Sequence, residues 1–361
     1  PSRKDLVELN KEGYAADADK AVYNGPFILK EWQHDASMVI EKNPNYWNKE
    51  AIKLDRVEFT IVTDSKTIVN MYEAGDLDLA ALSKDFIAKY DAEGKANYFA
   101  TGSEFFFQFN IKGKTPESGK FLANNNFRQA LGYAIDRQAF CDQVLKNGSK
   151  AAQRYILPLL MGDKDKFAVE YPYEFYPVNA DVAKAKELLD KALAELGTTA
   201  DKIPAIEYLT DDTDVARTIG EAIQDMLSKN LGIKVEIKQV QFKQRLELME
   251  AHDYELVFAG WGPDYDDPMT YTDLWVTGGG HNNTDWGNPE YDKLIAFAKT
   301  SPDSKARAEA MFASEKILLE QGPIVPIYFR NGVFAMQPYV KGIIRNFIGA
   351  DPDFVFADIQ K

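Results

Sequence analysis

The sequence predicts an α/β protein with two lobes, and three observations support that prediction. Its 361 residues exceed the size at which a single hydrophobic core usually stops growing. Strand and helix patterns alternate as β-α-β-α-β over residues 205–258, which implies parallel strands joined by right-handed crossovers. Residues 105–110 (FFFQFN) are apolar on both faces, as expected for an interior strand.

Residues 1–125 are expected to form part of the first lobe. The expected elements are a helical lead-in (1–22), a hairpin (23–42), a strand (54–63), a helix capped by Asp64 or Ser65 and ended by Gly75, a short strand (77–80) and the interior strand (105–110).

Residues 126–330 are expected to form the second lobe, and residues 331–361 to return to the first. The second lobe should contain a helix after Asn126 ended by Asn147-Gly148, a helix capped by Asn179, the alternating strands and helices of 205–258, helices from Pro289 and Ser304, and a last strand (324–329).

Composition excludes several classes of protein. The chain has 42 basic and 56 acidic residues, and a formal charge of -14 argues against nucleic acid or an anionic membrane surface as the main partner. The single cysteine, Cys141, allows neither an intramolecular disulfide nor a cysteine-based metal site, and it is expected to be buried. No stretch approaches the roughly 20 apolar residues of a membrane span. The start at Pro1, without a signal peptide, is typical of a mature or trimmed product.

The stretch 258–268 (FAGWGPDYDDP) is the strongest candidate for a binding site. Asp264 lies just beyond the carboxyl end of a predicted parallel strand, where ligands bind in open α/β sheets. Gly260 and Gly262 would let another backbone approach, and Trp261 would form a wall. The backbone could pair with an extended ligand as an added strand, while the carboxylate holds an ammonium group.

An acidic surface turn is the alternative interpretation of this stretch. Pro-Asp and Asp-Pro are turn signals, and Asp266 or Asp267 can cap a helix starting near Pro268. Spacing alone leaves both interpretations open for Asp264, whereas it favours the cap for Asp267. Phe242, at another strand-to-helix switch, is a further candidate for the pocket.

Motifs for metal binding or catalysis are absent from the sequence. A calcium loop starting at Asp264 would need Gly and Glu where Met269 and Trp275 stand. There is no H-E-x-x-H, G-x-S-x-G, Walker or G-x-G-x-x-G motif. The three histidines are far apart in the chain: His34, His252 and His281. We therefore expect no catalytic residue, metal or cofactor. A hydrolase with paired carboxylates stays open, because the separations between acids are invisible in a sequence.

Short motifs spread along the whole chain indicate a family. They are NGPF (24–27) with LKEW (29–32), EKNPNYW (41–47), EAGDLD (73–78), FRQAL (127–131) with AIDR (134–137), GWGPDYDDP (260–268), NPEYD (288–292) and PIVP (323–326). Each is weak alone, but their joint presence in this order is specific. On these motifs the chain resembles the extracytoplasmic oligopeptide- and dipeptide-binding proteins of ABC importers, known as family 5 solute-binding proteins.

The resemblance implies a two-lobed flytrap fold of the periplasmic-binding-protein type, with an extra domain on one lobe. It implies that Asp264 receives the α-amino group of the ligand and that the backbone from Gly260 to Gly262 pairs with the peptide. Trp261 and Phe242 would line side-chain pockets, and Asn110 would present a polar group to the cleft.

Two departures from the family pattern stand out. Relatives carry a substantial stretch before the point that matches Asn24-Gly25-Pro26, so this chain looks truncated at its N-terminus. A subgroup has an arginine at the position of Phe258, where it helps to neutralise the peptide's carboxylate. Phe258 cannot do this, which puts in doubt how this chain would recognise a ligand's C-terminus.

The resemblance predicts a monomeric receptor that captures oligopeptides in a cleft between its lobes and delivers them to the permease subunits of an ABC transporter. It would have no chemistry of its own and no nucleic-acid partner. It would act outside the cytoplasm of a bacterium, either lipid-anchored at the cell surface or in the periplasm. The alternatives are a different ligand in the same family (an oligosaccharide, a nickel chelate or a signalling peptide) or the hydrolase.

Overall fold

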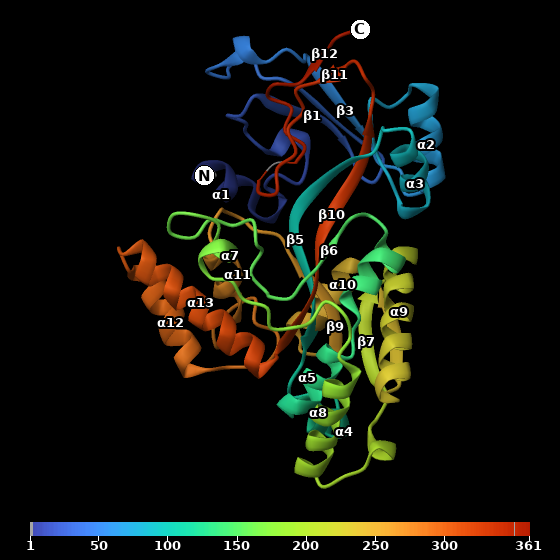
Figure 1. Cartoon of the computed structure of the whole chain (residues 1–361). Helices are drawn as coiled ribbons and strands as arrows, with labels where there is room; N and C mark the ends of the chain where they lie inside the picture. The colour runs from blue at the N-terminus through green and yellow to red at the C-terminus, as the bar shows by residue number, and fades with distance from the viewer. Residues whose placement is uncertain (1–2, 350) are drawn as a thin grey trace. The chain divides into compact units, whose positions relative to one another are not determined.

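A computed structural model describes residues 3–349 and 351–361 (Figure 1). The chain forms two compact units. The first contains residues 3–99, 333–346 and 351–361, and the second contains Ala100–Gly332 with Phe347–Gly349. The chain therefore passes between the units at residues 99–100, 332–333 and 346–347, and again between Gly349 and Asp351. The sequence analysis places the lobe boundaries at 125–126 and 330–331.

The described part of the first unit is built from short strands and three short α-helices. An antiparallel sheet has the order β1-β2-β3, and a second pair joins β11 to β12. Helix α2 is capped at its start by Asp64, whose carboxylate accepts the Thr67 N–H at 2.7 Å, and at its end by Gly75 with φ 85°. The predicted cap and stop are thereby confirmed. The elements of this unit are α1 (Lys4–Asn10), β1 (Phe27–Gln33), β2 (Ser37–Lys42), β3 (Arg56–Thr60), α2 (Ser65–Ala74), β4 (Leu79–Ala81), α3 (Lys84–Ala92), β11 (Val340–Lys341) and β12 (Asp358–Ile359).

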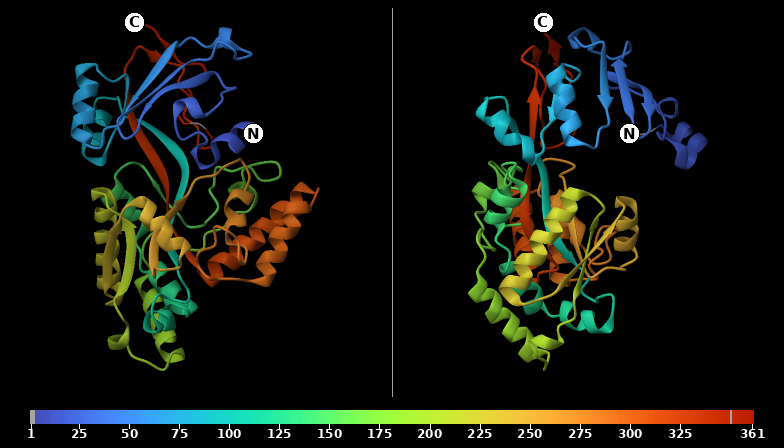
Figure 2. Two further views of the ribbon diagram at one scale, coloured as in Figure 1. Left: turned by 180° about the vertical axis from the view of Figure 1, so that it is seen from behind. Right: turned by 90° about the vertical axis from the view of Figure 1, so that its right-hand side faces the viewer.

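The second unit contains a mixed sheet with strand order β10-β5-β9-β7-β8, in which β5 and β10 lie side by side (Figure 2). Strand β7 pairs in parallel with β8 and with β9, whereas β5 pairs antiparallel with β9. Helices α9 and α10 connect the parallel strands, so the predicted β-α-β-α-β run is confirmed. Their bounds are β5 (Asn97–Phe109), β7 (Ile206–Asp211), α9 (Asp214–Leu231), β8 (Val235–Val240), α10 (Phe242–Glu250), β9 (Leu256–Trp261) and β10 (Ile324–Met336); β6 (Lys150–Ala151) pairs with β10.

Further helices surround this sheet, and two of the predicted helix boundaries are wrong. The helix expected after Asn126 breaks after Tyr133, because the Asp136 carboxylate accepts the Ala139 N–H at 2.8 Å and starts a new turn. Asp181 rather than Asn179 caps the next long helix. The helices are α4 (Pro116–Leu122), α5 (Asn125–Tyr133), α6 (Arg137–Ala139) continued by a π-helical turn η4 (Phe140–Leu145), α7 (Phe167–Glu170), α8 (Val182–Glu195), α11 (Met269–Thr272), α12 (Pro289–Thr300) and α13 (Ser304–Gln321).

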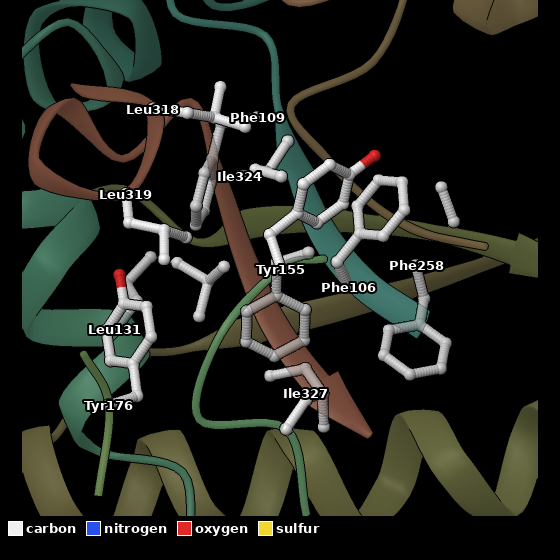
Figure 3. Packing of buried hydrophobic residues seen from close by; sticks show 14 of the residues in the cluster. Phe106, Phe109, Leu131, Tyr155, Tyr176, Phe258, Leu318, Leu319, Ile324 and Ile327 are labelled. Carbon is white, nitrogen blue, oxygen red and sulfur yellow. The ribbon is translucent and has the colours of Figure 1, made fainter. Parts of the chain in front are cut away.

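The core of the second unit is aromatic and lies around β5 and β10 (Figure 3). Phe106, Phe107 and Phe109 are all buried, which confirms the predicted interior strand. Phe106 packs edge-on against Tyr155, with ring centroids 5.6 Å apart. Cys141 is buried, as predicted. In the part of the chain that the structure describes, no helix is long and apolar enough to cross a membrane.

Candidate functional site

The candidate site begins where two parallel strands separate. The pairing of β7 with β9 ends at Leu209 and Val257, although β7 continues along β8 as far as Asp211 and Val240. Strand β9 also continues, but beyond Val257 it is paired only with β5 on its other side, up to Trp261 and Glu104. From Phe258 to Trp261, the edge of β9 opposite β5 therefore has no strand partner among the described residues, although the Phe258 carbonyl oxygen accepts a hydrogen bond from Nη1 of Arg245 at 3.4 Å. Backbone groups on such an edge can pair with an added strand.

A cavity of about 490 Å³ lies beside this edge, and its described lining comes from the second unit alone. It opens at the carboxyl ends of β7 and β9 and at the first turns of α9 and α10, the position where ligands bind in open α/β sheets. The lining includes Ser103, Phe105, Asp211, Phe242, Arg245, Phe258, Gly260, Trp261, Gly262, Tyr328 and Arg330.

The structure brings five of the sequence-predicted residues to this cavity: Phe242, Phe258, Gly260, Trp261 and Gly262. Gly260 lies opposite Phe105 in the pairing of β9 with β5. A Cβ atom added there would lie 2.9 Å from Cε1 of Phe105 and 3.0 Å from the carbonyl oxygen of Glu104. The absence of a side chain at Gly260 therefore lets the two strands pack against each other beside the cavity.

Three aromatic rings form one wall of the cavity. Phe105 stacks on Tyr328 with a centroid distance of 4.9 Å and an interplanar angle of 4°, and it lies 5.7 Å from Phe258. Phe258 is only 8% exposed, so its ring serves the wall and the core together. Phe242 is exposed at the start of α10 and supplies a further apolar surface.

Asp264 lies outside the cavity lining, in the exposed loop that follows β9. Its backbone N–H donates to Oγ1 of Thr270 at 3.0 Å, and the Trp261 indole N–H approaches the same oxygen at 3.4 Å. Among residues 3–349 and 351–361, no side chain forms a recorded hydrogen bond or ion pair with the Asp264 carboxylate. Thr270 thus fixes the backbone of the loop while the carboxylate stays available to solvent or to a ligand.

The neighbouring carboxylates have structural partners. Asp267 accepts the Met269 N–H at 2.8 Å and forms a two-pronged ion pair with Arg307, in which Nη2 lies 2.8 Å from Oδ1. The hydrogen bonds that Arg307 donates to the Asp267 carboxylate raise the pKa of Arg307 above its usual value. Asp266 accepts the Met161 N–H at 2.9 Å. Asp267 therefore bonds the first N–H of α11 from one position before the cap; the cap residue is Pro268, which has no side-chain cap bond, so the interpretation of Asp267 as the cap is not confirmed.

The structure does not bring Asn110 to the cavity. Its side chain is 1% exposed, and its amide donates to the carbonyl oxygens of His252 and Tyr254 at 2.9 and 3.1 Å. Its Oδ1 accepts the Lys112 N–H at 3.1 Å. Asn110 ties the end of β5 to the segment that leads into β9, and its polar atoms are engaged there.

Sequence reasoning missed three charged residues that line the cavity. Arg245 and Asp211 form a largely buried ion pair, with Nε 2.7 Å from Oδ1. Arg330 is exposed and lies directly after the predicted last strand, 324–329. The strand-end rule that selected Asp264 and Phe242 would also have pointed to Asp211 and Arg330. Nothing in the sequence distinguishes Arg245 from other helical arginines.

The arrangement suits binding of an extended ligand. It offers a strand edge, an aromatic wall and a carboxylate beyond the strand end, and these groups match the backbone, side chains and amine of a peptide. No group of three His, Cys, Asp or Glu side chains that could hold a metal ion occurs within the described ranges.

Comparison with known proteins identifies the family. The model of the bacterial extracellular solute-binding proteins, family 5 (middle region), matches residues 2–283. The chain is 32% identical over 343 residues to the dipeptide-binding protein DppE of Bacillus subtilis and 30% identical over 351 residues to the oligopeptide-binding protein OppA of the same organism. Each match covers 95% of this chain, which spans 61% and 62% of the length of those two relatives.

The solved structures agree. The structure of Listeria monocytogenes OppA bound to peptide aligns with 100% of this chain, at a TM-score of 0.86 and 34% identity, and the alignment covers 69% of the Listeria chain. The predicted α/β fold class with its mixed sheet is thereby confirmed, as is the resemblance found in the sequence motifs. The chain belongs to family 5 of the bacterial extracellular solute-binding proteins.

Proposed function

We propose that this chain is the ligand-binding part of a receptor that captures oligopeptides and delivers them to the permease of an ABC importer. The observation that supports this most directly is the β9 edge from Phe258 to Trp261, which is released from β7 beside a cavity of about 490 Å³. The names of the relatives agree, because two are a dipeptide- and an oligopeptide-binding protein and one solved structure holds a peptide.

A peptide would add a strand to this edge. Main-chain hydrogen bonds to residues 258–262 are available to any peptide, so they would supply affinity without depending on sequence. Gly260 and Gly262 carry no side chain that would keep the ligand's backbone away, and both are exposed. Phe242, Phe258 and Trp261 would contact ligand side chains.

Asp264 would fix the amino end of the peptide. Its carboxylate is exposed, has no recorded protein partner among the described residues, and follows the strand that the peptide would extend. A charge-assisted hydrogen bond from the ligand's ammonium group would set the register of the added strand. Asn110 has no part in this proposal, because its amide already bonds to His252 and Tyr254.

The remaining roles follow from the family. The receptor would act as a monomer outside the cytoplasm, as a cell-surface lipoprotein or in the periplasm, and would close over its ligand before docking on the permease subunits. It would catalyse no reaction and use no cofactor. The relatives named above are binding proteins rather than enzymes, which supports this view.

Calorimetry on the complete gene product tests the amine contact. Trialanine and N-acetyl-trialanine would be titrated into the wild type and into Asp264→Asn. Losing the bond to the ligand's cation should weaken binding by about 2–5 kcal/mol in either case, and acetylation should have little further effect in the variant. Asp266→Asn is the matched control, because it removes the same charge from the same loop but keeps an oxygen that can accept the Met161 N–H.

Three results would contradict the proposal at different levels. Equal affinities in both arms would remove Asp264 from the site and leave the peptide ligand standing. Native mass spectrometry of the purified protein should show co-purified peptides. A homogeneous sugar or metal complex in that spectrum would show that the ligand class is wrong, and peptide or glycoside hydrolysis that disappears on changing one acidic residue would favour the hydrolase.

A further inference from the structure

Two arginines, Arg245 and Arg330, line the cavity, and only Arg245 has a carboxylate partner among the described residues. Arg245 lies 2.7 Å from the Asp211 carboxylate, is 8% exposed, and is therefore neutralised within the protein. Arg330 lines the same cavity and is exposed, and it has no recorded ion pair with any carboxylate in residues 3–349 and 351–361. With Asp211 and Arg245 paired, Arg330 leaves this cavity with a positive charge.

The Arg330 guanidinium is held in place from two sides. Its Nε donates to Oγ1 of Thr101 at 3.2 Å, and its Nη2 donates to Oγ of Ser103 at 3.3 Å. Its Cζ lies 5.2 Å from the centre of the Phe105 ring, within the range of a cation–π contact. These contacts orient the planar group, so less side-chain freedom remains to be lost when a ligand binds.

Two hydrogen bonds leave most of the guanidinium available. Arginine has five N–H donors, and no recorded bond to a described residue uses Nη1. A planar fork with free N–H groups matches a carboxylate, which accepts two parallel hydrogen bonds. An unpaired cation is also notable in a chain whose 56 acidic residues outnumber its 42 basic ones, because acidic partners are abundant.

We propose that Arg330, oriented by Thr101, Ser103 and the Phe105 ring, is a specificity-determining residue that binds a carboxylate of the peptide ligand. Phe258, on the same aromatic wall, carries no charge and cannot take this role. The carboxylate is either the C-terminal group of a short peptide or an acidic side chain. The inference rests on the proposed function, since it assigns one end or one side chain of the ligand to a named residue.

A set of paired ligands and variants tests the proposal on the complete gene product. Trialanine and trialanine amide probe the C-terminal carboxylate, and Ala-Glu-Ala with Ala-Gln-Ala probe an acidic side chain. In the wild type, removing the relevant carboxylate should weaken binding about tenfold to a hundredfold, as expected for a hydrogen bond between charged groups. In Arg330→Gln, both members of that pair should bind with the weaker affinity. Arg330→Lys should restore part of the difference, because it keeps the charge but loses the fork.

The matched control is Arg217→Gln. Arg217 is exposed on α9, and removing it lowers the net charge equally without changing a residue of the cavity lining. It should leave the ratio between the members of each pair unchanged. If the same loss appears in Arg217→Gln, the effect is long-range electrostatics and the proposal is wrong.

The possible outcomes distinguish a failure of the Arg330 proposal from a failure of the proposed peptide-receptor function. If peptides bind and neither pair discriminates, or if Arg330→Gln keeps the wild-type discrimination, the Arg330 proposal is overturned and the peptide receptor stands. If no peptide binds, both are overturned. Which of the two pairs responds identifies the source of the carboxylate.

Discussion

Polar groups on the two faces of strand β5 differ in their exposure and in their hydrogen-bond partners. On one face, Ser103 and Phe105 line the cavity. On the other face, Glu104 is 0% exposed, and neither carboxylate oxygen has a hydrogen-bond partner among the described residues. Because side chains alternate along a strand, adjacent positions face the cavity and a sealed interior.

Several polar groups are buried on the sealed side of β5, and they differ in how many hydrogen-bond and ionic partners the protein gives them. Glu315 is fully buried but well satisfied, since it pairs with Arg154 and accepts the N–H groups of Tyr155 and Ile156 at 3.0 and 2.8 Å. Glu104 has no such support, and burial, together with the nearby Glu315, raises its pKa well above the usual value. The two faces therefore differ in where a polar group finds its hydrogen-bond partners. On the cavity face, solvent or a bound molecule can supply them, whereas on the sealed face only the protein can.

The largest expected difference in stability is between two single variants, one that removes a buried arginine on the sealed side of β5 and one that removes an arginine of the cavity. Arg154→Met would leave Glu315 charged and buried without its ionic partner, so the free energy of unfolding should fall by about 3–5 kcal/mol. Arg330→Met, on the cavity face, should change it by no more than about 0.5 kcal/mol, because Arg330 is exposed and has no recorded ionic partner among the described residues. Urea denaturation of both variants measures this. Equal losses would show that Arg330 has a structural role.

Glu104→Gln should change how stability depends on pH. The pKa of Glu104 is raised in the folded protein, so the folded chain holds a proton that the unfolded chain has lost above pH 4.5. Raising the pH from that value towards the folded pKa therefore favours unfolding. The variant lacks this penalty, so its stability relative to the wild type should rise by up to about 1.4 kcal/mol per pH unit.

Urea titrations between pH 5 and 8 would reveal this trend. Glu236→Gln, exposed on β8, is the control and should follow the wild type throughout. A difference between Glu104→Gln and the wild type that stays constant with pH would show that Glu104 ionises normally in the folded protein.

The sequence predicted elements with local signals and missed groups that depend on packing. The β7-to-β9 alternation, the Asp64 cap and the buried phenylalanines follow from periodicity and capping chemistry, and all are confirmed. The break after Tyr133 was missed, because apolar residues continue through it and only the Asp136 cap marks a new turn. Glu104 carries no sequence signal of its burial, since that depends on Tyr155 and Trp275 packing around its strand from elsewhere in the chain.

The site divides in the same way. Four candidate residues at the end of β9, and Phe242 after β8, line one cavity because parallel strands end at the same edge of a sheet. The candidates Asp264 and Asn110 are not part of its lining. The separation of β7 from β9 creates the exposed edge, and it depends on where the pairing between β7, β8 and β9 stops. No single stretch of sequence contains it.

A substitution at Gly260 tests how closely the two strands must pack beside the cavity. In Gly260→Ala the new methyl group would meet the Phe105 ring at 2.9 Å and the Glu104 carbonyl oxygen at 3.0 Å, so the strands must shift. Overpacking of this kind should lower the free energy of unfolding by about 1–3 kcal/mol. Gly262→Ala is the matched control, since its nearest atom is Oγ of Ser103 at 3.4 Å, an ordinary contact. Thermal denaturation that places both variants at the wild-type midpoint would contradict this account.

The smallest change in stability is expected for Tyr155→Phe, and Tyr254→Phe is its comparison. Both tyrosines are buried on the sealed side of β5, but only the Tyr254 hydroxyl has hydrogen-bond partners among the described residues. The Tyr254 hydroxyl donates to the Asn283 carbonyl oxygen at 2.6 Å and accepts from Gln108 at 2.9 Å, so Tyr254→Phe should cost about 1–3 kcal/mol. The Tyr155 hydroxyl is equally buried but has no hydrogen-bond partner among the described residues. Tyr155→Phe should therefore leave stability within about 0.5 kcal/mol of the wild type or raise it slightly, because it removes a polar atom that folding desolvates without compensation. Chemical denaturation of the two variants side by side is the measurement. A loss above about 1 kcal/mol in Tyr155→Phe would mean that this hydroxyl is satisfied in solution, and that the sealed face of β5 is hydrated.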